Sequence, residues 1–111
     1  MYRLKFSKLY DTDVDSSYNY IIHNLQAPMA AENLIKETIL KLEKIKQNPK
    51  IRPLVNDKYL AVLGYRSMKV KNYLIFYIIG NDNKTVKIVR FLYGKRNWMS
   101  LLKEENMEEI M

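Results

Sequence analysis

The sequence has no cysteine and only three glycines, three prolines, one histidine and one tryptophan. Without cysteine the chain forms no disulfide or zinc ribbon and has no thiol nucleophile. The glycines are scattered at positions 64, 80 and 94, so a glycine-rich phosphate loop is absent. The only histidine, His23, lacks neighbouring metal ligands, and we predict a solvated or helix-capping role for it. Ser67 has no adjacent base to activate it. The absence of these residues and motifs argues against metal sites, hydrolase triads and nucleotide-binding enzymes.

Long hydrophobic runs are also missing. No apolar stretch approaches the roughly 18 residues that span a bilayer, and residues 1–6 lack the apolar core of a signal peptide. We therefore predict a cytoplasmic protein with no membrane partner and no cofactor.

Charge is unevenly distributed along the chain. The 111 residues hold 19 bases and 12 acids, for a net charge of +7, but Glu104, Glu105, Glu108 and Glu109 supply four of the acids. Residues 1–103 thus carry 19 bases and 8 acids, a net +11. This surplus favours an anionic partner, either nucleic acid or an acidic protein segment, although a lysine-rich solvated surface would look the same. We predict one domain over residues 1–103 and an acidic tail over 104–111.

The clearest β-sheet pattern lies between Tyr59 and Trp98. Three runs rich in β-branched and aromatic residues, 59–70, 73–79 and 85–93, are separated by turn residues, which predicts an antiparallel meander. The middle run is apolar at nearly every position and should be a central strand covered on both faces. The third run interleaves apolar residues with Lys87 and Arg90, so one of its faces should meet solvent or a partner.

The remaining segments predict one more strand and three helices. Alternation of Tyr2, Leu4 and Phe6 indicates a short inward-facing strand that joins the sheet. A first helix is expected over 13–25, capped by Thr12 and Asp15, and a second from Pro28 to Asn48, ahead of Pro49. A short terminal helix follows from Met99, with Leu101, Leu102, Met107 and Ile110 as apolar positions. The buried stripe of the second helix should be Ala31, Leu34, Ile35, Ile39, Leu42 and Ile45.

The resulting order is β-α-α-β-β-β-α. We therefore predict an α+β fold in which an αα-hairpin packs on a twisted, mainly antiparallel four-stranded sheet.

The candidate binding residues are basic and aromatic side chains of the sheet region. Arginine binds phosphate and tyrosine stacks on bases, so the combination favours RNA, whereas ordinary strand packing and edge protection would require the same residue types. The candidates are Tyr65, Arg66, Lys69, Lys71, Arg90, Tyr93, Lys95 and Arg96, with Tyr73 and Trp98 in the same region.

Three segments carry a resemblance to a known family: Gly64-Tyr65-Arg66-Ser67, then 72–77 (Asn-Tyr-Leu-Ile-Phe-Tyr), then 89–98 (Val-Arg-Phe-Leu-Tyr-Gly-Lys-Arg-Asn-Trp). Together with the element order, they resemble the RelE/ParE family of bacterial toxins from type II toxin-antitoxin modules, over residues 2–102. The resemblance implies a growth-inhibiting, plasmid-stabilising toxin held inactive by a cognate antitoxin protein. RelE-type members cut mRNA on the ribosome, whereas ParE-type members poison DNA gyrase.

The resemblance also implies where a nuclease would keep its catalytic residues. Nuclease members carry two lysines where Tyr65 and Ser67 stand, an arginine at Leu74, an arginine that Arg96 matches and a tyrosine at Leu102. Aliphatic side chains can neither accept the 2′ proton nor hold the phosphate. The chain thus looks closer to the ParE branch, with Arg66, Arg90 and Arg96 as candidate gyrase contacts.

Two alternatives remain open. A shift of the alignment would let Arg66, Lys69 or Lys71 stand in for the missing lysines, and Arg96 would then belong to a ribosome-dependent mRNA endonuclease whose partners are the ribosome and mRNA. The chain could also be a non-toxic basic RNA-binding domain, recognised by steeply salt-dependent RNA affinity.

Overall fold

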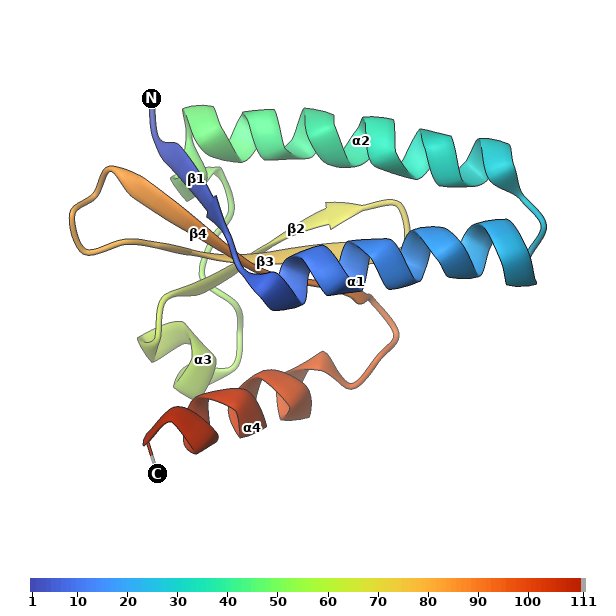
Figure 1. Cartoon of the computed structure of the whole chain (residues 1–111). Helices are drawn as coiled ribbons and strands as arrows, with labels where there is room; N and C mark the ends of the chain where they lie inside the picture. Colours follow the sequence, from blue (N-terminus) through green and yellow to red (C-terminus); the bar gives the residue numbers. More distant parts are fainter. Residues whose placement is uncertain (111) are drawn as a thin grey trace.

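A four-stranded sheet lies between two pairs of helices in the computed structural model, which describes residues 1–110 and the side chains of residues 1–106 (Figure 1). The strands are β1 (Arg3–Phe6), β2 (Tyr65–Val70), β3 (Tyr73–Ile79) and β4 (Thr85–Tyr93), in the spatial order β1-β4-β3-β2. β1 pairs in parallel with β4, and the other pairs are antiparallel. The α+β class, the meander and the joining of the N-terminal strand are confirmed.

The helices form the outer layers. On one face lie α1 (Lys8–Asn19), its π-helical extension η1 (Tyr20–Asn24) and α2 (Pro28–Gln47); on the other lie α3 (Lys58–Val62) and α4 (Trp98–Ile110). A short 3-10 turn, η2 (Pro49–Ile51), follows α2. The predicted acidic tail therefore begins inside α4, because residues 104–110 continue its helix. The side chains of Met107 and Ile110 and all of residue 111 lie outside the described part.

The central strand β3 is covered on both faces, as its apolar sequence predicts. Ile75 and Tyr77 pack under α1 and α2, whereas Phe76 packs under α3 and α4. All three are fully buried. The sheet therefore has a hydrophobic core on each face. Each such side chain contributes on the order of 2 kcal/mol when removed from water.

The first helix begins earlier than predicted. Ser7, in an extended conformation, accepts a hydrogen bond from the Tyr10 amide at 3.0 Å and is the N-cap. The Thr12 hydroxyl instead donates to the Lys8 carbonyl within the helix. The predicted start at residue 13 was wrong because a local hydroxyl at Ser7, placed by the end of β1, already satisfies the first free amides.

The strand predicted over residues 59–70 was wrong over its N-terminal half. Asp57 accepts a hydrogen bond from the Leu60 amide at 3.0 Å and caps α3, with Leu60 fully buried. The chain then passes through Gly64, whose φ of +94° ends the helix, and β2 starts at Tyr65. The capping aspartate and the glycine thus outweigh the β propensity of the apolar residues between them.

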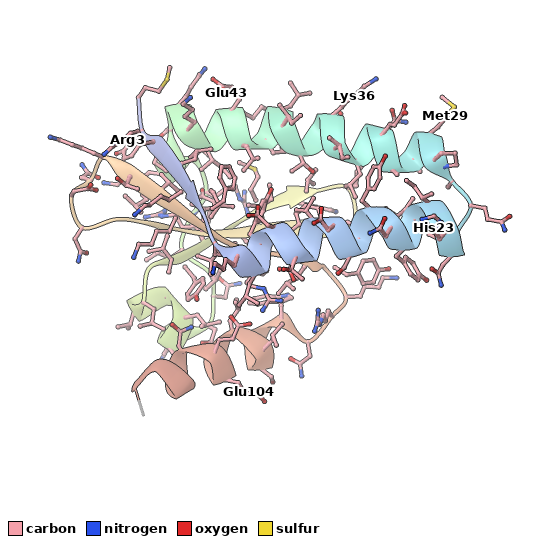
Figure 2. All side chains as sticks on the ribbon, viewed as in Figure 1. Arg3, His23, Met29, Lys36, Glu43 and Glu104 are labelled. Carbon is pink, nitrogen blue, oxygen red and sulfur yellow. The ribbon has the colours of Figure 1, made fainter. Side chains whose placement is uncertain are left out.

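The second helix has the predicted ends but a narrower buried stripe. Ile35 and Ile39 are 37% and 60% exposed, and Thr38 is buried in their place. The Thr38 hydroxyl donates a hydrogen bond to the Leu34 carbonyl. Lys36 and Glu43 lie on the outer side of α2 (Figure 2). Phe6 of β1, also predicted to face inward, is 45% exposed because β1 is an edge strand.

A bulge in β4 changes which of its side chains are buried. Phe76 pairs with Arg90 but the next residue, Tyr77, pairs with Ile88, so Val89 is an extra residue. The bulge places Arg90 on the same face of the sheet as Phe76, where it is buried at 6% exposure. The prediction that this face of β4 meets solvent was therefore wrong at Arg90, although Lys87 is exposed.

Candidate functional site

The face where nuclease relatives would keep their catalytic residues is filled by an apolar core. Tyr65 and Leu102 are buried at 2% and 0% exposure, and Leu74 packs beside them. α4 lies over this face, where Trp98 packs on Phe76 with ring centroids 5.0 Å apart. The Asn106 amide also donates to the Tyr65 hydroxyl at 3.0 Å. Tyr65 and Leu102 are therefore closed to an RNA strand in this arrangement.

Arg90, a predicted contact residue, belongs instead to a buried ion cluster. Its guanidinium donates to both carboxylate oxygens of Asp13 on α1, at 2.7 and 2.8 Å, and also to Glu105 on α4. The hydrogen bonds that Arg90 donates to Asp13 raise the pKa of Arg90, against the effect of burial. Burial raises the pKa of Glu105, and Arg90 offsets this only in part. The cluster joins α1, β4 and α4 and leaves Arg90 unable to contact a partner.

Asp13 has a second role at the sheet edge. β1 ends at Phe6, so beyond Ile88 the edge of β4 that faces away from β3 has no neighbouring strand. The Ser7 amide donates to the Ile88 carbonyl at 3.0 Å, and the Ser7 hydroxyl donates to Val89 at 2.6 Å. Asp13 then accepts the Phe91 amide at 3.0 Å. The start of α1 therefore satisfies the open edge of β4, which would otherwise expose unpaired backbone groups.

An open groove lies between the helical hairpin of α1, η1 and α2 and the end of the sheet at the β2–β3 turn. Its volume is about 860 Å³. One wall comes from the helices and the other from the β2–β3 turn, the end of β4 and Arg96. The helical wall includes Ser16, Ser17, Tyr20, Ile21, Leu25, Ala30, Asn33 and Leu34, and the sheet wall includes Lys71, Asn72, Tyr73, Phe91, Leu92 and Tyr93.

Aromatic rings form the sheet wall of this groove. Tyr73 stacks on Phe91 with centroids 4.8 Å apart and an interplanar angle of 12°. Tyr93, 41% exposed, meets Tyr73 edge-on at 5.7 Å. Tyr20 faces the same space from η1 and is 52% exposed. The groove therefore combines an apolar, aromatic wall with open access from solvent.

The charges of the groove are positive. Lys71 and Arg96 line it and form no ion pair among the described side chains, whereas the carboxylate of Asp13 is occupied by Arg90. Lys71 has a φ of +54°, a left-handed conformation that is costly for a residue with a Cβ. Strain of this kind is often retained where a side chain is needed.

The eight predicted site residues thus fall into three places. Lys71, Tyr93 and Arg96 line the groove, with exposed Lys95 next to them in the chain. Lys69 and Arg66 lie on the edge strand β2, and Tyr65 and Arg90 are buried.

Sequence reasoning missed the helical wall and Arg52. Tyr20 lies outside the apolar stripe of its helix, and an aromatic residue in such a position was the available signal. No sequence pattern distinguishes Asn33 from other exposed residues of α2. Arg52, in the loop after η2, became apparent only through its contact with β2. His23 is exposed near the turn between η1 and α2 (Figure 2).

The described residues include no helix long and apolar enough to cross a membrane. They also include no cluster of three or more side chains suited to a metal ion.

Comparison with known proteins identifies the family. The model of the family described as the ParE toxin of the type II toxin-antitoxin system parDE matches residues 4–98. No curated protein sequence matches the chain. Among solved structures, the chromosomal ParDE system of P. aeruginosa is similar with a TM-score of 0.66 and 16% identity, covering 84% of this chain and 96% of that one.

Two RelE-type structures share the fold. The RelBE2 toxin-antitoxin complex of Mycobacterium tuberculosis gives a TM-score of 0.55 at 15% identity, covering 83% of this chain and 96% of its own. The isolated E. coli RelE toxin gives 0.54 at 13% identity, with both chains covered in full. The family match ends at Trp98, where α4 begins. This chain belongs to the ParE toxin family of type II toxin-antitoxin systems, within the wider RelE/ParE fold.

Proposed function

We propose that the protein is a toxin that inhibits DNA gyrase by protein-protein contact and is neutralised by a cognate antitoxin. The observation that carries the proposal is the apolar filling of the face where a nuclease would act. Tyr65, Leu74 and Leu102 lie in one packed core under α4. Leu74 and Leu102 supply neither a general base nor a cation to a phosphate, which supports binding as the means of action. Gyrase and the toxin would meet in the cytoplasm.

Purified gyrase tests this proposal. Added toxin should block supercoiling of relaxed plasmid and accumulate cleaved DNA that remains attached to gyrase. A heat-denatured sample of the toxin is the control for additives in the preparation. Supercoiling that proceeds normally with the folded toxin in excess would exclude gyrase as the target.

The groove is the proposed docking site for the antitoxin. An acidic, amphipathic segment fits it, because apolar side chains would cover Tyr73 and Tyr93 while carboxylates reach Lys71 and Arg96. The ParDE and RelBE2 structures contain antitoxins bound to toxins of this fold, which supports a partner of the same kind here.

Co-expression with the product of the short reading frame next to the toxin gene tests this docking site. Lys71→Gln with Arg96→Gln should weaken the complex at least about tenfold, since each charged contact across an interface contributes about 1 kcal/mol or more. Lys84→Gln with Lys87→Gln removes two exposed lysines near β1 and should leave affinity nearly unchanged. Equal loss in the two variants would mean that only overall charge matters.

A ribosome-dependent mRNA endonuclease is the second candidate. It is supported by exposed Arg96, the one catalytic position that matches, and by the similarity to isolated RelE along the whole chain. Message cut within ribosomes of a translation extract that contains the toxin would establish it, and Arg96→Gln should then abolish cutting. Intact message would remove this candidate.

A further inference from the structure

One continuous segment of the chain carries a net charge equal to that of the whole protein. Residues 44–81 run from the last turn of α2 through η2, α3, β2 and β3 into the loop after β3, and they hold eight bases and one acid, a net +7. The single acid, Asp57, is paired with Lys103 at 2.8 Å. The segment includes the edge strand β2, and a cluster of bases with so few acids is the electrostatic pattern of a site for a polyanion.

Two arginines of this segment, Arg52 and Arg66, are held in place by hydrogen bonds to each other's stretch of backbone. The Arg66 guanidinium donates to the carbonyl of Arg52 at 2.5 Å, and Arg52 Nε donates to the carbonyl of Ser67 at 3.1 Å. Both guanidinium groups also oppose the burial that raises the pKa of Tyr77, so both lie within electrostatic reach of one buried hydroxyl. The pair is therefore held in place before any partner binds.

The pair has no anion of its own. Among the described side chains neither arginine forms an ion pair, whereas Arg90 has Asp13 and Glu105. Each guanidinium has five N–H donors, and the bonds above use one on each. Two adjacent like charges with most of their donors free are suited to an external anion that matches the guanidinium fork.

A phosphodiester backbone fits this surface. It presents anions in a regular row, and the pair is flanked along the chain by Lys50, two residues before Arg52, and Lys69, three residues after Arg66. Both lysines are exposed. Phosphate contacts made by such cations position a protein on a duplex without reading its bases.

We propose that the β2 edge, centred on Arg52 and Arg66, binds the backbone of duplex DNA without sequence preference. This goes beyond gyrase inhibition by protein contact, because the toxin itself would touch DNA. It also stands independently, since binding is measured in the absence of gyrase.

Fluorescence anisotropy with a labelled duplex of arbitrary sequence tests the proposal over a series of salt concentrations. Arg52→Gln with Arg66→Gln should weaken binding at least about tenfold at low salt and lower the slope of log affinity against log salt by about two, one for each lost phosphate contact. Lys84→Gln with Lys87→Gln has the same charge change at the opposite side of the sheet. It should weaken binding by less than about threefold.

Arg52→Lys with Arg66→Lys keeps the charge and removes the forks, so it should bind with an affinity between those of the wild type and the glutamine variant. It also serves as the test variant if the glutamine variant unfolds, which thermal unfolding would reveal. The proposal is wrong if the wild type does not bind the duplex. It is also wrong if the double glutamine variant at Arg52 and Arg66 and the one at Lys84 and Lys87 lose affinity equally. Tighter binding of polyglutamate than of DNA, with the same dependence on the arginines, would instead identify an acidic protein segment as the ligand.

Discussion

Arg90 shows how strongly a single residue depends on its surroundings. In the sequence it is one cation in a basic strand, but in the fold it is buried and holds two carboxylates from different helices. A buried guanidinium is tolerated only when such partners replace its water. Arg90 therefore contributes to the attachment of α1 and α4 rather than to a binding surface.

Removing Asp13 should test this role. Asp13→Asn leaves Arg90 with only Glu105, so we expect a loss of about 3 kcal/mol in the free energy of unfolding, at the low end for a broken buried ion pair. Urea denaturation measures it. Asp15→Asn changes an exposed acid of the same helix and should cost less than about 0.5 kcal/mol. Equal stability of the two variants would show that the cluster contributes little.

Glu105 should make stability depend on pH in an unusual direction. Its pKa is raised in the fold by burial, so the folded chain keeps this proton to a higher pH than the unfolded chain. Between the two values the unfolded state binds fewer protons, and stability falls as the pH rises. Glu105→Gln lacks this titration.

We therefore expect the wild type to lose stability relative to Glu105→Gln as the pH rises above about 4.3, the usual glutamate value. Urea denaturation of both proteins at a series of pH values measures the difference. The pKa values of Asp57 and Asp82 are lowered in the fold, so their contributions to stability are lost only when the pH falls below this range. If the wild type instead becomes more stable relative to Glu105→Gln as the pH rises, the direction of the Glu105 pKa shift is wrong.

At the scale of elements, the β2–β3 turn joins structure and function. Its two residues, Lys71 and Asn72, both line the groove, and the Asn72 carbonyl accepts a hydrogen bond from Gly94 at 2.7 Å. This bond ties the turn to the end of β4. Lys71 has the left-handed backbone conformation that glycine adopts readily. The turn thus holds a charged side chain in the groove at a cost to the backbone.

Lys71→Gly should separate stability from binding. Relief of the backbone strain and the greater freedom of the unfolded chain nearly cancel, so the free energy of unfolding should change by less than about 1 kcal/mol. Antitoxin affinity should fall several-fold because a groove charge is lost. Asn83→Gly is the matched control, since Asn83 has a φ of +56° in the β3–β4 loop, away from the groove. Weaker binding in both variants would assign the effect to turn flexibility.

At the scale of the whole molecule, three layers and an uneven charge distribution act together. Helices cover both faces of the sheet, and residues 1–103 carry a net charge of +11 that the four glutamates of residues 104–109 reduce to +7. Such an arrangement favours association with acidic partners, but the bases repel one another within the folded chain.

Salt should therefore stabilise the isolated protein. Raising the ionic strength from about 0.01 M to about 0.15 M shortens the screening length from about 30 Å to about 8 Å, which weakens repulsion across the molecule. We expect the thermal midpoint to rise by a few degrees, measured by circular dichroism. Sodium and potassium chloride should act alike. A midpoint that falls with salt would mean that attractive surface pairs dominate.

Much of the fold was readable from the sequence. Apolar periodicity over 73–79 and 28–48, with turn residues between the runs, located β3 and α2 and predicted the meander. These patterns are local, and the two-sided burial of β3 follows from its composition alone. The family resemblance was readable for the same reason, since it rests on short segments along the strands.

Other features needed the tertiary structure. The bulge at Val89 reverses the face of Arg90, and the partners that bury it come from residues 77 positions before and 15 positions after it in the chain. The groove and the Arg52–Arg66 pair likewise join distant segments. The sequence by itself determined most of the elements and the net charge, because these follow from local patterns and composition. Which cations remain exposed was decided by packing, because only the folded chain determines where a carboxylate can reach them.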